Sequence, residues 1–125
     1  EYGPPGAHRY LRDTARSIVA NYDVDGLNLD FIRYPGPDPE ANAAPEQPPR
    51  FGYNPVALDR YEAATGRADP DPDDESFVKW RREQVTALMR RIYHACFAID
   101  PSVRVSVDAV PRGAPTNTAR NNATT

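Results

Sequence analysis

The feature that most constrains the fold is a short apolar segment that ends in a carboxylate. Residues 26–32 are Gly-Leu-Asn-Leu-Asp-Phe-Ile, and Arg-Tyr-Pro-Gly follows them. Large apolar residues at this density are typical of a strand buried on both faces, as in a parallel sheet. Alternation puts Asn28 and Asp30 on one face, and the apolar residues, Phe31 among them, on the other. A carboxylate in such a strand is costly unless it is paired or used, which makes Asp30 the first candidate for function.

The rest of the chain predicts three helices and a second strand around this segment. Apolar residues at helical spacing predict a helix over about 8–22, and the Pro-rich stretch 35–55 predicts a long loop. Two further helices are expected over 55–65 and from 74 to about 99, and a strand over 103–110. A strand–helix–strand unit predicts a parallel pair, so the fold class is α/β with parallel strands.

Local signals mark where the second and third helices begin and end. Asn54 is a good N-cap, Pro55 suits the first helical position, and Gly66 suits the left-handed position after the last turn. Asp73 or Asp74 can cap the third helix. The apolar stripe expected along that helix consists of Phe77, Val85, Leu88, Ile92, Cys96 and Ile99.

Composition excludes several classes of function. At 125 residues the chain could form one small domain, and its net charge of −3 without a basic stripe gives no case for binding nucleic acid. Nothing resembles a signal peptide or a membrane span. The single cysteine, Cys96, falls on the apolar side of a predicted helix, where an inert buried thiol is expected.

Two carboxylates are expected to meet at one edge of the sheet. Parallel strands end on the same edge, and Asp30 and Asp108 each lie near that end. Glycoside hydrolysis needs such a pair: one carboxyl protonates the leaving oxygen, and the other attacks the sugar or activates water. Arg33 could hold Asp30 ionised or bind a sugar or a substrate carboxylate. Candidate stacking platforms for a sugar are Tyr34, Phe51, Tyr53 and Trp80.

Structural roles are open for the same residues. Asp30 could be the partner of Arg33 or of a helix N-terminus, and Asp108 could cap a loop. Asp23 and Asp25 form an Asp-x-Asp pair of the kind that binds Mg²⁺ or Mn²⁺ in nucleotide-sugar transferases, although their place at a helix–strand junction favours turn and cap roles. No Gly-rich phosphate loop and no Cys/His cluster is present, so neither a cofactor nor a metal is expected.

The same segment resembles a known family. Residues 22–35, Tyr-Asp-Val-Asp-Gly-Leu-Asn-Leu-Asp-Phe-Ile-Arg-Tyr-Pro, closely resemble a motif of glycosyl-hydrolase-like family 10. Residues 51–66, the Trp-Arg helix over 77–85 and the strand segment 101–107 are similar to later parts of that family. The resemblance covers about residues 3–115.

The resemblance implies a fold, an activity and a location. Family members are bacterial, mostly exported (β/α)₈ barrel proteins, and a full barrel takes roughly 250 residues. Residues 1–125 would then be an internal fragment of the barrel domain, from the third helix to just past the fifth strand. The implied activity is cleavage of glycosidic bonds in a polysaccharide, and one branch acts on peptidoglycan strands stripped of their peptides. The implied location is periplasmic, cell-envelope or extracellular.

The resemblance also implies roles for individual residues. Asp30 would be the nucleophile or charge stabiliser, since a Gly-x-x-x-Asp segment carries the nucleophile in the more distantly similar alpha-amylase superfamily. The acid there is a Glu on the fifth strand, whereas this chain offers Asp108, so the acid is either Asp108 or a residue outside the chain. The residues expected to bind the substrate are Asn28, Arg33, Tyr34 and Tyr53.

Two other readings stay open. A carbohydrate-binding barrel would use the same polar residues to hold a sugar without cutting it. A metal-dependent glycosyltransferase would use Asp23 and Asp25, and it would require a divalent cation.

Overall fold

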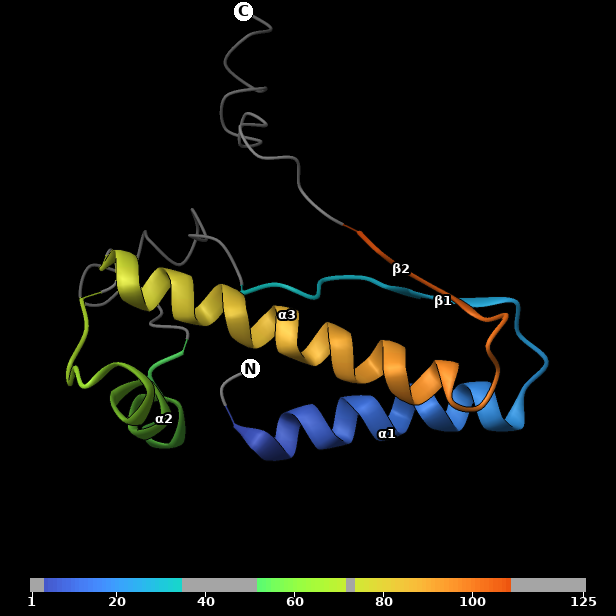
Figure 1. Ribbon diagram of the computed structural model, residues 1–125, viewed down its shortest axis with the longest axis horizontal. Coiled ribbons are helices and arrows are strands. Elements are labelled where there is room, and N and C mark those ends of the chain that lie inside the picture. The colour runs from blue at the N-terminus through green and yellow to red at the C-terminus, as the bar shows by residue number, and fades with distance from the viewer. Residues whose placement is uncertain (1–3, 35–51, 72–73, 109–125) are drawn as a thin grey trace, which may run out of the picture.

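The computed structural model describes residues 4–34, 52–71 and 74–108. It is a mixed α/β fold in which β1 and β2 pair in parallel. The helices α1 and α3 lie side by side along the sheet, and both strands run against the direction of these helices (Figure 1). The elements are α1 (Pro5–Asn21), β1 (Gly26–Leu29), α2 (Pro55–Thr65), α3 (Glu75–Phe97) and β2 (Arg104–Val107). The predicted parallel pair, with two helices between its strands, is therefore confirmed.

The observed bounds differ from the predicted ones mainly at the ends of elements. α1 begins at Pro5, earlier than expected, because proline fits the first turn of a helix, where its missing N–H is not needed. Both strands are shorter than expected: β1 ends at Leu29 and β2 at Val107. Most of the predicted long loop, residues 35–51, and the last two residues of the predicted second strand lie outside the described residues.

The predicted caps of α2 are confirmed. The Asn54 side chain accepts a hydrogen bond from the Ala57 N–H at 2.9 Å, and Pro55 occupies the first helical position. Gly66 follows the helix with φ of 70°, and its N–H donates to the Glu62 carbonyl at 2.7 Å. These local bonds satisfy backbone groups that a helix end leaves without a partner.

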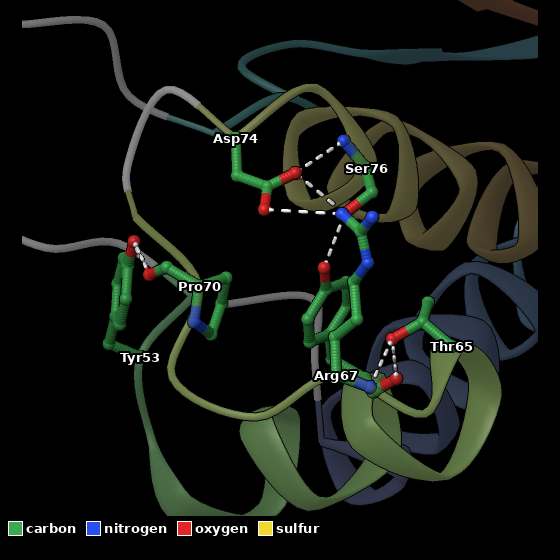
Figure 2. Close-up of polar contacts among 7 residues, drawn as sticks. Tyr53, Thr65, Arg67, Pro70, Asp74 and Ser76 are labelled. Atoms are coloured by element: carbon green, nitrogen blue, oxygen red, sulfur yellow. Dashed lines mark hydrogen bonds and ion pairs between the residues drawn. The ribbon is translucent and has the colours of Figure 1, made fainter.

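A polar cluster joins the end of α2 to the start of α3 (Figure 2). The Asp74 carboxylate accepts hydrogen bonds from the Ser76 N–H at 2.8 Å and from the Ser76 hydroxyl at 2.7 Å. The Ser76 hydroxyl also contacts the Tyr61 hydroxyl, and Arg67 donates to it at 3.2 Å. Asp74 is therefore the N-cap of α3, and its partners hold the two helices together.

Acidification should remove the stabilising effect of this cap. Hydrogen bonds from the Ser76 hydroxyl and N–H, helped by the charge of Arg67, lower the pKa of Asp74 below its ordinary value. A carboxyl with a lowered pKa in the folded state stabilises the protein fully above its ordinary pKa, and the stabilisation is lost as the pH falls through the lowered value. Asp74→Asn keeps an acceptor that does not titrate. Denaturant unfolding at several acidic pH values should show a shallower loss of stability in this variant than in the wild type, and identical slopes would contradict the assignment.

One hydrophobic core lies between α1, α3 and the sheet. Its buried members are Ala15, Val19, Leu88, Ile92, Cys96 and Val103, and the half-buried Leu27, Leu29 and Val105 pack against it from the strands. Cys96 is fully buried, and burial raises the pKa of its thiol, as expected for an inert cysteine. His8 is also buried, and its Nδ1 lies 3.1 Å from a guanidinium nitrogen of Arg91, so this histidine is a packing residue.

A second core lies between α2 and the first half of α3. Its buried members are Ala57, Tyr61, Phe77 and Trp80. Phe77 is at the centre: its ring meets the Tyr61 ring edge-on at 5.1 Å and stacks on Trp80 at 6.0 Å. Trp80 is 5% exposed, so it packs the helix instead of offering a platform to a sugar.

The buried stripe of α3 differs in part from the predicted one. Trp80 and Gln84 take the places expected for Val85, which is only half-buried, and Ile99, which is exposed. Gln84 can be buried because its amide is satisfied: it donates to the Trp80 carbonyl at 3.3 Å and accepts from Arg60 at 3.0 Å. No described helix is both long and apolar enough to cross a membrane.

Gly26 allows β1 and β2 to approach closely. A Cβ at this position would lie 2.7 Å from the backbone oxygen of Arg104, which cannot move without breaking the strand pair. Gly26→Ala should therefore destabilise the protein by about 1–3 kcal/mol, the usual range for overpacking. Urea unfolding would measure this loss. Gly6→Ala is the matched control, because a Cβ at Gly6 meets nothing within 4 Å and alanine favours the helix. Equal stability of the two variants would contradict the steric argument.

Candidate active site at the carboxyl end of the sheet

The two faces of the sheet differ in chemistry. Leu27 pairs with Val105 in the parallel register, and both face the core beneath α1 and α3. Asn28 pairs with Ser106, and both are exposed on the opposite face. The prediction that β1 is buried on both faces is therefore wrong for the described residues, since only the apolar face is covered.

Asn28 and Ser106 form a direct cross-strand contact. The Ser106 hydroxyl donates to Oδ1 of Asn28 at 2.8 Å. This bond fixes the orientation of the Asn28 amide, whose N–H₂ group can then donate elsewhere. The polar face of the sheet thus presents an oriented amide next to a hydroxyl, groups that suit the hydroxyls of a sugar.

Asp30 and Asp108 follow this pair at the carboxyl end of the two strands. The Asp108 N–H donates to the Leu29 carbonyl at 3.2 Å, so the ladder between the strands continues past Val107. The paired register ends at Leu29 and Val107, so Asp30 and Asp108 are the next residues of the two strands at the same edge of the sheet. Both carboxylates are exposed, as a site open to substrate requires.

The chain turns sharply after Asp30. Phe31 has φ of 52°, and the Arg33 N–H donates to the Phe31 carbonyl at 2.7 Å. Oδ1 of Asp30 accepts from the Phe31 N–H at 2.7 Å, which holds the carboxylate against its own backbone. The prediction that Phe31 continues the apolar face is wrong: the turn ends the alternation and leaves this residue 68% exposed. A left-handed aromatic residue is uncommon, and such residues cluster at functional sites.

Arg33 and Tyr34 follow this turn and lie near the first half of α3. The guanidinium carbon of Arg33 lies 5.1 Å from the centre of the Phe31 ring, and within the described part of the chain Arg33 forms no ion pair with Asp30. Tyr34 lies near the second core, where the guanidinium carbon of Arg81 is 5.8 Å from its ring centre. These two residues therefore line the region beside the carboxyl end of β1, at the first turns of α3.

Tyr53 is held in the second core. Its hydroxyl donates to the Pro70 carbonyl at 2.9 Å (Figure 2), and its ring meets Phe77 edge-on at 4.9 Å. Both ends of the side chain therefore have partners within the protein. The role of Tyr53 in binding substrate stays a prediction, whereas its packing role is observed.

Asp23 and Asp25 lie at the other end of β1. They line an open hollow together with Asp100, Ser102 and Arg104, at the amino ends of the strands. Among residues 4–34, 52–71 and 74–108, no group of three or more His, Cys, Asp or Glu side chains is arranged to hold a metal ion. The hollow extends along the strands as far as Asn28 and Ser106. Asp23 and Asp25 themselves precede β1, at the opposite edge from Asp30 and Asp108, as predicted.

A comparison with models of protein families shows which family the chain belongs to. The family model described as Glycosyl hydrolase-like 10 matches residues 2–124, almost the whole chain. The chain belongs to this family. The observed parallel strands with helices on one face are consistent with a segment of a (β/α)₈ barrel of Glycosyl hydrolase-like 10. No curated protein and no solved structure matches the chain significantly.

Ser106 is the residue at this site that sequence reasoning missed. It was available from the pattern: Asn28-Leu29-Asp30 and Ser106-Val107-Asp108 both read polar, apolar, aspartate. Because β1 and β2 of this Glycosyl hydrolase-like 10 protein are neighbouring parallel strands, the shared pattern places Asn28 beside Ser106 in the observed register.

Proposed function

We propose that this protein hydrolyses glycosidic bonds in a polysaccharide, with Asp30 as nucleophile or charge stabiliser and Asp108 as acid/base. The observation that supports the proposal is the parallel register, which continues through the Asp108 N–H to the Leu29 carbonyl at the edge of the sheet where Asp30 also lies. Membership in Glycosyl hydrolase-like 10 supports the same reaction class.

The two aspartates would have different roles in the cleavage reaction. One carboxylic acid donates its proton to the glycosidic oxygen as the bond to the anomeric carbon breaks. The other carboxylate either attacks that carbon or takes a proton from the water that attacks it. A carboxyl separation of roughly 5–5.5 Å gives retention of anomeric configuration, and a wider separation gives inversion.

The neighbouring polar groups would position the sugar. The Asn28 amide, oriented by Ser106, supplies N–H donors next to the reacting carbon. Arg33 and Tyr34 would bind the part of the glycan that extends past the end of β1. In a closed barrel the face that carries Asn28 and Asp30 would be the interior, where a bound glycan is shielded from water.

A substrate and a cellular location are further parts of the proposal. The substrate is a bacterial or environmental polysaccharide, with peptidoglycan glycan strands as the first candidate. Such a substrate lies outside the cytoplasm, so the proposal includes export of the protein. A carbohydrate-binding protein without hydrolysis is the alternative, because the Asn28–Ser106 pair could hold a sugar without either carboxylate.

Asp108→Asn tests the acid/base assignment. Incubation of the intact protein with purified glycans should release new reducing ends, and the variant should release them about 10²–10⁴ times more slowly, the usual range for removal of a general acid or base. The plot of cleavage rate against pH should lose the limb that reports the ionisation of Asp108. Ser106→Ala, two residues earlier on the same strand, controls for disturbance of β2 and should act mainly on substrate affinity.

Two outcomes would contradict part of the proposal. Full activity of Asp108→Asn would assign the acid to another residue of the protein. Glycan binding by the wild type without any new reducing ends would establish the binding function in place of hydrolysis.

A further inference from the structure

A groove lined by three arginines begins where β1 ends. Arg33 lines it from the turn after the strand, and Arg81 and Arg82 line it from the second turn of α3. Tyr34 forms part of its wall, and apolar side chains, including Val85, form the rest. The open space is about 350 Å³, enough for one substituted sugar residue.

The charge of this groove is opposite to that of the chain as a whole. The protein carries a net charge of −3, yet the groove is lined by three guanidinium groups and by no Asp or Glu among the described residues. Glu83, the residue next to Arg82, lies 4.0 Å from the ammonium group of Lys79 and does not line the groove. Within the described ranges neither Arg33 nor Arg82 forms an ion pair.

Aromatic contacts hold two of the arginines in place. The guanidinium carbon of Arg81 lies 4.8 Å from the Phe77 ring centre and 5.8 Å from that of Tyr34. The guanidinium carbon of Arg33 lies 5.1 Å from the Phe31 ring centre. Contact with an aromatic ring restricts the motion of a guanidinium group, so less conformational entropy is lost when that group binds an anion.

We propose that this groove binds an anionic substituent of the glycan, a carboxylate or a sulfate ester on a sugar one or two residues from the scissile bond. Arg33 lies three residues after Asp30, and the chain after β1 continues towards the first half of α3 (Figure 1), so a glycan held at Asp30 can extend into the groove. Guanidinium groups bind carboxylates and sulfates through paired N–H donors. The inference rests on the proposed function, because it names the substrate class of that site as acidic glycans.

Calorimetric binding to three matched probes tests the inference. The first probe is an oligosaccharide of alternating glucuronic acid and N-acetylglucosamine. The second is the same oligosaccharide with its carboxyls reduced to primary alcohols, and the third is the reduced oligosaccharide with these alcohols O-sulfated. The intact wild-type protein should bind the first or third probe at least about tenfold more tightly than the second, as expected for one charge-assisted hydrogen bond. Which of the two anions binds more tightly identifies the substituent.

Two variants on α3 show whether the groove is responsible. Arg82→Gln removes an exposed arginine and should lose most of the preference for the anionic probe while keeping the affinity for the reduced one. Arg90→Gln removes an exposed arginine further along the same helix, outside the groove, and should keep the preference. Equal binding of all three probes by the wild type, or a preference that Arg82→Gln retains, would overturn the inference.

The same samples separate this inference from the proposed function. Cleavage of neutral glycans without any anionic preference would leave hydrolysis standing and overturn the acidic-glycan assignment. A groove-dependent anionic preference without new reducing ends would keep the assignment and overturn hydrolysis.

Discussion

Asp30→Asn should abolish glycosidic cleavage and leave the fold intact. Asparagine has nearly the same size as aspartate and keeps an oxygen that can accept the Phe31 N–H, which Asp30 binds at 2.7 Å. It cannot act as a nucleophile or stabilise a positive charge that develops on the sugar. We expect a loss of at least about 10³-fold in kcat, since removing a group that acts in the chemical step has effects of this size or larger. Release of reducing ends measures the activity, and denaturant unfolding measures the fold.

Asp25→Asn is the control for this variant. Asp25 precedes β1 on the opposite edge of the sheet, so the substitution removes the same charge far from the carboxyl end. It should leave cleavage unchanged. Wild-type turnover by Asp30→Asn would remove Asp30 from the mechanism. Loss of activity in Asp25→Asn, together with a requirement for Mn²⁺, would instead favour the metal-dependent glycosyltransferase.

Phe77→Ala should cause the largest loss of stability of any single truncation in the second core. Phe77 has no exposed surface, and its ring contacts Tyr53, Tyr61 and Trp80. Truncation leaves a cavity among three aromatic side chains that cannot all close over it, and such changes cost about 3–5 kcal/mol. Urea unfolding should show a lower midpoint with an unchanged slope.

Tyr10→Ala is the matched control for the loss of an aromatic ring. Tyr10 lies on α1 and is 72% exposed, so its truncation creates no cavity. Its stability should stay within about 0.5 kcal/mol of the wild type. A similar midpoint for both variants would mean that the second core contributes little to the stability of the whole chain.

Local sequence signals predicted the helices better than the strand ends. The bounds of α2 follow from Asn54, Pro55 and Gly66, each of which acts on its own backbone or that of a near neighbour. The end of β1 depends on a hydrogen bond between Asp30 and the Phe31 N–H, which overrides the strand preference of a Phe-Ile pair. Apolar pattern alone cannot detect such a turn.

Contacts between distant segments explain the remaining differences. Gln84 is buried because Arg60, 24 residues earlier, satisfies its amide. His8 is buried beside Arg91, 83 residues later. No periodicity argument contains these pairings, whereas the position of Asp30 and Asp108 at the same edge of the sheet follows from the general rule for parallel strands and could be predicted.

The cross-strand bond between Asn28 and Ser106 joins residues 78 positions apart in the chain. Contacts of such long sequence separation require a large loop to close before they can form, and they slow folding. The helices can form from local signals, but the paired aspartates exist only after this closure. During refolding, the pairing of β1 with β2 would therefore trail the recovery of helical signal, and a nascent chain would bring Asp30 and Asp108 to one edge only after β2 has been synthesised.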